Sequence, residues 1–166
     1  MGPRRRSGPA TRQVDLVTIT GNVAQVFLTD EDWISTLSAI HSTLRPGGRL
    51  VFEVRDPAKE AWQEWDRART YKRQVLPGSG AVEMWVGLTR VDLPMVSFRQ
   101  TFVFEIDGAV ITSDSTLRFR TRAEIEASLR VTSYMVEEVR DAPDRPGFEF
   151  VFIAHRSAAE RPGSHG

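Results

Sequence analysis

The sequence predicts an α/β fold in which a sheet of parallel strands with helices has an antiparallel closing edge and carries an inserted antiparallel β-sheet. Three observations support this class. Residues 14–55 read as strand, helix and strand, residues 70–119 contain only β-type runs separated by turn residues, and residues 121–154 read as a helix followed by two strands. Strand–helix–strand units build parallel sheets, whereas consecutive short β runs build antiparallel ones.

The first strand is expected at residues 14–20, a short, β-branched and mostly apolar run that a Gly-Asn pair stops. Such a run is typical of a parallel strand buried on both faces. A helix should begin after Thr29, because this residue precedes three acidic residues and predicts an N-cap with negative charge in the first turn. Apolar positions recur at helical spacing up to Leu44, and residues 45–48 (Arg-Pro-Gly-Gly) end the helix.

The second strand is expected at residues 49–55, another short apolar run. Residues 14–55 therefore form a βαβ unit, whose crossover is right-handed in nearly all known cases. Asp56 then offers an N-cap in front of Pro57, and proline suits the first position of a helix. This pair predicts a short helix over residues 58–65.

From residue 70 onward the pattern changes to β-type runs. These runs lie at about residues 70–76, 82–92, 95–106 and 109–119. An Asp-Gly pair between two alternating segments, as at Asp107-Gly108, is a strong signal for a tight hairpin. We expect these runs to form an antiparallel sheet inserted into the α/β frame.

The last part of the chain predicts a helix and two closing strands. Thr121 and Glu124 have capping-box spacing and open a helix that continues to about residue 131. Residues 134–139 and 148–154 read as strands. The segments 1–13 and 157–166 lack periodicity and are expected to be disordered tails, which leaves a single domain at residues 14–156 with its insert at about 70–119.

Composition narrows the classes of function. The chain has 166 residues, 40% of them hydrophobic, and its 22 basic and 22 acidic residues give zero net charge. No overall field therefore favours nucleic acid or an anionic membrane. The absence of cysteine excludes disulfides, thiolate metal sites and a cysteine nucleophile. No apolar run approaches the roughly 20 residues of a membrane span. We expect a cytoplasmic protein without a bound metal.

Three segments, in this order, resemble part of a known family. They are residues 15–24, the Leu-Arg-Pro-Gly-Gly element at 44–48, and residues 49–53. They look like the fourth strand, the end of the following helix and the fifth strand of class I S-adenosylmethionine-dependent methyltransferases. The later segments 115–129 and 148–154 are similar to the end of a substrate-covering insert with its following helix and to the final strand. The resemblance covers roughly residues 14–155 and implies a partial Rossmann-like methyltransferase sheet.

The sequence departs from this family in two places. The glycine-rich loop after the first strand and the acidic residues after the second and third strands have no counterpart here. Only about 13 residues precede the first predicted strand, which is far short of the several βα units required. We therefore expect a truncated C-terminal part of the fold, either because the reading frame begins upstream of Met1 or because the chain is a remnant. The second departure is Thr132-Ser133-Tyr134, where the family often has Gly-Phe.

The resemblance also implies a cofactor site. In the family, the turn after the fourth strand lines the methionine end of S-adenosyl-L-methionine, so Thr20, Gly21 and Asn22 are the expected cofactor-binding residues. Taken alone, Gly-Asn is ordinary turn chemistry and favours a plain strand-to-helix turn. The Asn-Pro-Pro-Tyr type of motif found in amino-methylating nucleic-acid enzymes is absent, which with zero net charge favours a small-molecule acceptor over nucleic acid. The implied activity is methyl transfer, accelerated largely by positioning, and no catalytic residue is assigned.

Two arginines are candidates for binding the acceptor. Arg118 and Arg120 are two apart on a predicted strand, so both side chains should point to one face, where they could bind a carboxylate or phosphate. Pairing with acids such as Glu105 or Asp114 is the favoured alternative.

Aromatic residues offer a further candidate for substrate binding. Trp85 could form one wall of an acceptor pocket together with Trp62 and Trp65. Aromatic residues at helical and strand spacing more often belong to the core. His41 lies among apolar residues of the first helix, where a structural role is favoured over that of a base.

Two other readings of function remain open at this stage. The chain could be a non-catalytic remnant or interaction module that keeps the fold without binding cofactor. It could also complete its sheet against another polypeptide or self-associate, because a strand at residues 14–20 that lacks its usual neighbours would leave an apolar sheet edge exposed.

Overall fold

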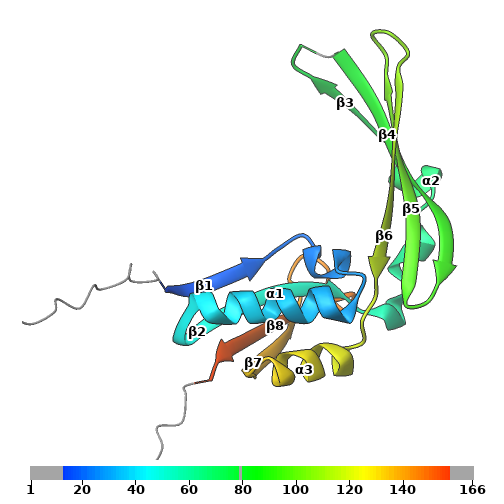
Figure 1. Ribbon diagram of the computed structural model, residues 1–166. Helices are drawn as coiled ribbons and strands as arrows, with labels where there is room; N and C mark the ends of the chain where they lie inside the picture. Colours follow the sequence, from blue (N-terminus) through cyan, green and yellow to red (C-terminus); the bar gives the residue numbers. More distant parts are fainter. Residues whose placement is uncertain (1–12, 79, 158–166) are drawn as a thin grey trace, which may run out of the picture.

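The computed structural model describes residues 13–78 and 80–157 (Figure 1). The tails expected at 1–13 and 157–166 lie, apart from residues 13 and 157, outside these ranges. The strands are β1 (Val14–Ile19), β2 (Leu44–Arg55), β3 (Lys72–Leu76), β4 (Gly80–Asp92), β5 (Met95–Phe104), β6 (Val110–Arg118), β7 (Tyr134–Asp141) and β8 (Glu149–Arg156). The helices are α1 (Asp30–Thr43), α2 (Arg67–Thr70) and α3 (Arg122–Val131), with 3-10 segments at Val23–Val26, Pro57–Lys59 and Ala61–Glu64.

The strands form two four-stranded sheets. The first has the order β1-β2-β8-β7, with β1 parallel to β2 and the other neighbours antiparallel. The second, β3-β4-β5-β6, is antiparallel throughout. Figure 1 shows the second sheet projecting from one end of the first as a long arm. The expected mixed α/β sheet with an antiparallel closing edge is therefore confirmed.

Helices α1 and α3 cover the same face of the first sheet. The core between them consists of apolar residues from both helices and from β2, β7 and β8, among them Trp33, Leu37, Leu50, Phe52, Ile125, Leu129, Tyr134 and Phe152. Trp33 fixes the two helices to each other, because its indole N–H donates to the Ser128 hydroxyl at 2.9 Å. Burying each large apolar side chain stabilises the fold by about 1.5–3 kcal/mol, so this layer dominates the stability of the sheet.

The predicted N-terminal ends of both main helices are confirmed. The Thr29 hydroxyl accepts a hydrogen bond from the backbone N–H of Asp32 at 3.1 Å. Thr121 and Glu124 form a complete capping box, in which each side chain binds the backbone of the other residue. These contacts satisfy N–H groups that have no partner within the helix.

The prediction that the first strand is buried on both faces is wrong for β1. Its only neighbour among the described residues is β2, so it forms an edge of the sheet. Val14 and Leu16 are 38% and 53% exposed. An apolar run therefore indicated the strand correctly, but periodicity gave no information on whether other elements cover it.

The segment between β2 and the arm also differs from the prediction. Asp56 does cap it, accepting a hydrogen bond from the backbone N–H of Ala58 at 3.0 Å. The prediction of a single helix over residues 58–65 is wrong, however, because Glu60 has a left-handed backbone (φ 45°) and divides the segment into two 3-10 turns. This break lets Trp62 pack edge-on against Phe119 at the base of the arm, with 4.6 Å between ring centroids.

Candidate functional site

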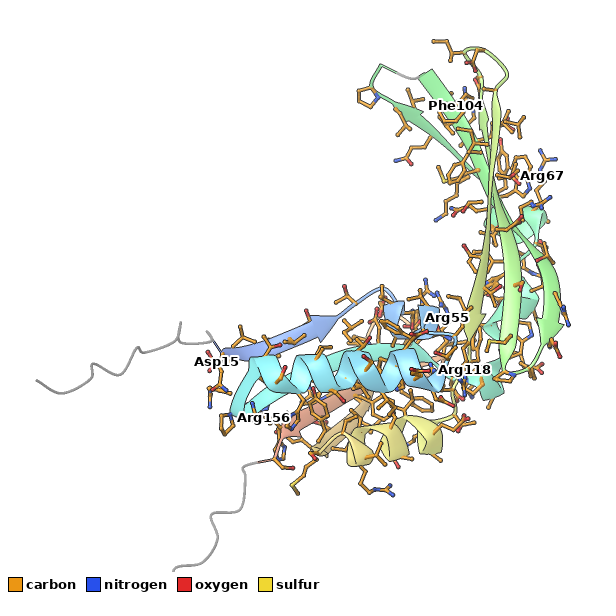
Figure 2. The ribbon with its side chains drawn as sticks, in the orientation of Figure 1. Asp15, Arg55, Arg67, Phe104, Arg118 and Arg156 are labelled. Atoms are coloured by element: carbon orange, nitrogen blue, oxygen red, sulfur yellow. The ribbon has the colours of Figure 1, made fainter. Side chains whose placement is uncertain are left out.

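The ends of several strands meet where the first sheet joins the arm. The parallel strands β1 and β2 both end at this edge. Because β8 is antiparallel to β2, its first residue, Glu149, pairs with Arg55, the last residue of β2. Ligands of open α/β sheets bind beyond the carboxyl ends of the parallel strands. In Figure 2, Arg55 lies at this junction, whereas Phe104 lies toward the far end of the arm.

The turn after β1 has a left-handed backbone at two successive residues. Gly21 has φ 69° and Asn22 has φ 58°. The backbone N–H of Gly21 donates to the Glu53 carboxylate at 2.6 Å, which fixes the turn to β2. A Cβ placed on Gly21 would meet no atom within 4 Å, so the space beside this backbone is open. The turn therefore combines a fixed backbone with room for a ligand.

Asn22 belongs to a buried polar network. Its side-chain amide donates to Glu149 at 3.1 Å, and both residues are almost fully buried. Arg55 donates to the Gln25 side chain at 2.9 Å and approaches Glu149 at 3.9 Å, while Arg145 donates to Glu149 at 3.3 Å. Glu149 thus connects the turn after β1 with two guanidinium groups.

The network leaves two buried polar atoms without a partner. They are Oδ1 of Asn22 and Nε2 of Gln25, neither of which makes a hydrogen bond within the described residues. Buried polar atoms are normally satisfied, and exceptions occur at functional sites. The free oxygen of Asn22 lies in the turn to which the resemblance assigns cofactor contacts.

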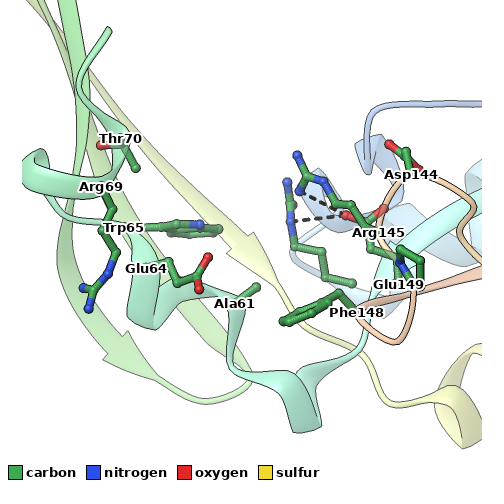
Figure 3. Close-up of a pocket in the computed structure, with 11 residues that line it drawn as sticks. Ala61, Glu64, Trp65, Arg69, Thr70, Asp144, Arg145, Phe148 and Glu149 are labelled. Carbon is green, nitrogen blue, oxygen red and sulfur yellow. Dashed lines mark hydrogen bonds and ion pairs between the residues drawn. The ribbon is translucent and has the colours of Figure 1, made fainter.

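A cavity of about 520 Å³ lies next to this network. It is lined by Arg55, Ala61, Glu64, Trp65, Arg69, Thr70, Asp144, Arg145, Pro146, Phe148 and Glu149. Figure 3 shows Trp65 and Phe148 pointing into the same space from the arm side and the sheet side. Its volume falls in the usual range for small-molecule sites.

The site residues predicted from the sequence fall into three groups, which are the turn after β1, the two arginines and the aromatic residues. Thr20, Gly21 and Asn22 lie together at the end of β1, as expected. Arg118 and Arg120 also lie together, but both contact Asp30 at the start of α1, at 3.0 and 3.5 Å.

The two arginines also bind backbone oxygens. Arg118 donates to the carbonyl oxygen of Leu28 and Arg120 to that of Thr29. The contacts of the two arginines with Asp30 lower the pKa of that carboxyl group, chiefly through the hydrogen bond from Arg118. Neither favoured alternative partner is used, since Glu105 pairs with Arg73 and Asp114 with Arg99.

The aromatic candidates are separated from one another. Trp85 lies on the arm with the guanidinium of Arg67 4.2 Å from its ring centroid. Trp62 is buried in the core at the base of the arm, and Trp65 packs there against Phe98 while also lining the cavity. Of the three tryptophans, Trp65 alone is among the lining residues of this cavity.

Sequence reasoning placed Arg55 at the end of a parallel strand without giving it a role, and it missed Glu149. Glu149 stood within an apolar run, flanked by Phe148 and Phe150, and was assigned to the final strand without a role. The available signal was a charged residue at the start of a strand expected to run antiparallel. The first residue of such a strand lies at the edge where the parallel strands end.

Two further searches gave negative results. Within residues 13–78 and 80–157, no three His, Asp or Glu residues come together as metal ligands. In the same ranges, no helix has the length and apolar character needed to cross a membrane.

No protein-family model matches the sequence, and no curated protein matches it. Solved structures do match this chain. A methyltransferase dependent on S-adenosylmethionine from Clostridium acetobutylicum superimposes with a TM-score of 0.66 at 14% identity, over 92% of this chain and 62% of that one. The CcbJ methyltransferase from Streptomyces caelestis gives 0.67 at 17% identity, over 93% and 61%. A sugar N-methyltransferase from Streptoalloteichus gives 0.68 at 15% identity, over 89% and 57%.

These likenesses establish a shared fold. The chain spans about three fifths of the length of the solved methyltransferases that it resembles. Its mixed sheet matches theirs, which confirms the resemblance inferred from the sequence at the level of the fold.

Proposed function

We propose that this chain forms part of a methyltransferase that uses S-adenosyl-L-methionine to methylate a small-molecule acceptor. The observation that carries the proposal is the buried contact between Asn22 and Glu149. It joins the turn after β1, a ligand-binding position in sheets of this kind, to the wall of a 520 Å³ cavity. A donor at the turn and an acceptor in the cavity would be neighbours, as transfer between them requires.

The turn has features that suit the cofactor. Gly21 offers open space beside its backbone, and Asn22 offers a buried oxygen without a hydrogen-bond partner. Thr20, Gly21 and Asn22 would hold the methionine portion, and the bound cofactor would supply an activated methyl group. Glu53 fixes the backbone at Gly21, and Glu149 orients the Asn22 side chain. The role of these residues is to position the two reactants.

A small-molecule acceptor is supported by two facts. The chain has zero net charge, which provides no general attraction for nucleic acid. Among the solved structures of the same fold are an amino pentose methyltransferase from Micromonospora echinaspora and the sugar N-methyltransferase mentioned above. The assignment of Arg118, Arg120 and Trp85 to the acceptor stays a prediction, and Arg118→Ala would test it through the Michaelis constant of an anionic acceptor.

The proposal is tested by nuclear magnetic resonance on the 166-residue chain. S-adenosylmethionine is titrated to millimolar concentration, because the glycine-rich loop has no counterpart here and weak binding is expected. The amide resonances of Gly21 and Asn22 should shift, and those of Gly78 and Gly108 in the turns of the arm should not. Asn22→Ala should reduce the shifts. An absence of changes at Gly21 and Asn22 would contradict a cofactor site in this turn.

A further inference from the structure

The cavity beside the network has aromatic walls. Trp65 comes from the segment that links β2 to the arm, and Phe148 from the loop before β8. Figure 3 shows the two rings extending toward one another across the space. Trp65 is held in place by edge-on packing against Phe98, with 4.9 Å between centroids. A planar ligand entering the cavity would therefore meet at least one aromatic face of fixed orientation.

The wall of the cavity beside Glu149 carries two guanidinium groups. Arg55 and Arg145 share one buried carboxylate, that of Glu149. Glu149 is the carboxylate nearest to both guanidinium groups, and the charge of Glu53 acts on Arg55 more weakly than that of Glu149. The side chain of Arg55 is only 18% exposed, so water compensates the charge of its guanidinium poorly.

The remaining charged residues of the lining are exposed. Arg69 forms an ion pair with Asp66 outside the lining. Glu64 and Asp144 line the cavity as well, and water screens their charges and that of Arg145, because all three residues are exposed. Arg55 is therefore the cation of the lining that water screens least.

The pKa of Arg55 reflects its burial and its charged neighbours. Burial lowers the pKa of Arg55, and the neighbouring Arg145 lowers it further, although Glu149 and, more weakly, Glu53 oppose both effects. An anion bound beside Arg55 and Arg145 would relieve this penalty. The Arg55 guanidinium also lies 5.7 Å from the centroid of the Trp65 ring, so the cationic and aromatic walls of the cavity meet.

We propose that this cavity binds a small aromatic carboxylic acid, with its ring against Trp65 and Phe148 and its carboxylate on the Arg55–Arg145 pair. Guanidinium groups bind carboxylates through two parallel hydrogen bonds, which fixes the orientation of the acid as well as its charge. The inference rests on the proposed function in one respect, since such an acid would then be the methyl acceptor.

Calorimetry on the full 166-residue chain tests the inference with two probes of nearly equal shape, an anion and a neutral amide. These are 2-naphthoate and the neutral 2-naphthamide, titrated without cofactor. The chain should bind naphthoate at least about 10-fold more tightly than naphthamide. Arg145→Gln should weaken naphthoate binding about 10-fold and leave naphthamide binding unchanged, because Arg145 provides one of the two guanidinium groups. Phe148→Ala should weaken the binding of both probes.

Arg122→Gln is the matched control, because Arg122 is an exposed arginine that pairs with Glu126 on α3. It should leave both affinities unchanged, and thermal melts should show that every variant is folded. Equal affinity for the two probes, no binding of naphthoate, or equal effects of Arg145→Gln and Arg122→Gln would overturn the inference. Because the titration contains no cofactor, its outcome is independent of the resonance shifts that test S-adenosylmethionine binding.

Discussion

Asn22 and Glu149 are 127 positions apart in the sequence, yet their side chains share a buried hydrogen bond of 3.1 Å. Asn22 follows β1 and Glu149 begins β8, with β2 lying between these strands in the sheet. The geometry of the turn after β1 therefore depends on a strand near the end of the chain. Any change that detaches β8 should also release the turn.

Removing Glu149 should be strongly destabilising. Glu149→Ala would leave Arg55 buried without its carboxylate, and breaking a buried ion pair in this way costs about 3–5 kcal/mol. Urea denaturation would measure this loss as a lower transition midpoint. Glu137→Ala, which removes an exposed carboxylate paired with Arg49 on the same sheet, is the control and should change the midpoint little. Similar midpoints for the two variants would show that the buried network does not stabilise the fold.

The pair Asp30–Arg118 should make stability depend on pH in the acidic range. The pKa of Asp30 is lowered from 3.8, mainly by the hydrogen bond from Arg118. A carboxyl group whose pKa is lower in the folded state contributes stability that is complete above the unfolded pKa and is lost as the pH falls through the folded pKa. The free energy of unfolding should therefore decrease as the pH falls below about 4.

Arg118→Gln should reduce this decrease, because the variant loses the donor that lowers the pKa. Urea titrations between about pH 3 and 6 would compare the two proteins. Glu105 and Asp114 also have lowered pKa values, through Arg73 and Arg99, so a residual slope is expected in the variant. Identical slopes would mean that Asp30 does not depend on Arg118.

Much of the fold follows from local sequence signals. The N-caps at Thr29 and Thr121 fixed the starts of α1 and α3, because an N-cap is defined by residues within one helical turn. The break at Glu60 carried no such signal, since a left-handed backbone is uncommon at a residue of this type. The exposure of β1 could not be predicted from the sequence either, because it depends on which other elements lie beside the strand.

The candidate site was likewise predictable only where a local sequence signal exists. Gly21 and Asn22 were predictable, because a Gly-Asn pair after an apolar run marks a turn at a strand end. The partnership of Arg118 with Asp30 was not, because the two residues are 88 positions apart and only the packing of the arm against α1 brings them together. Glu149 was missed for the same reason.

Gly21 should resist substitution because of its backbone conformation. Its φ of 69° lies in the left-handed region, which costs an L-residue about 1–2 kcal/mol, while an added Cβ would touch nothing. Gly21→Ala should therefore lower the free energy of unfolding by about 1 kcal/mol. Gly87→Ala on β4 is the matched control, since its added Cβ also meets open space and its φ is not in that region. Equal effects of the two substitutions would contradict a conformational cause.

The edge strand β1 leads to a final prediction, that the purified chain self-associates. Among the described residues β1 pairs only with β2, so the backbone groups on its other side have no strand partner. Val14 and Leu16 add apolar side chains to this edge. Unprotected edges of this kind pair with other strands, and natural proteins block them with charged residues, lysine above all.

Sedimentation velocity over a range of protein concentrations would reveal this association. Leu16→Lys should shift the chain toward the monomer, because a lysine at the edge must be desolvated when a second strand pairs there. Val131→Lys makes the same change of charge on α3, where the valine is 73% exposed, and should leave the association unchanged. If the unsubstituted chain sedimented as a monomer at every concentration, the free side of β1 would not be an associating edge. If the two lysine variants dissociated the complex equally, added charge rather than the position of β1 would be the cause.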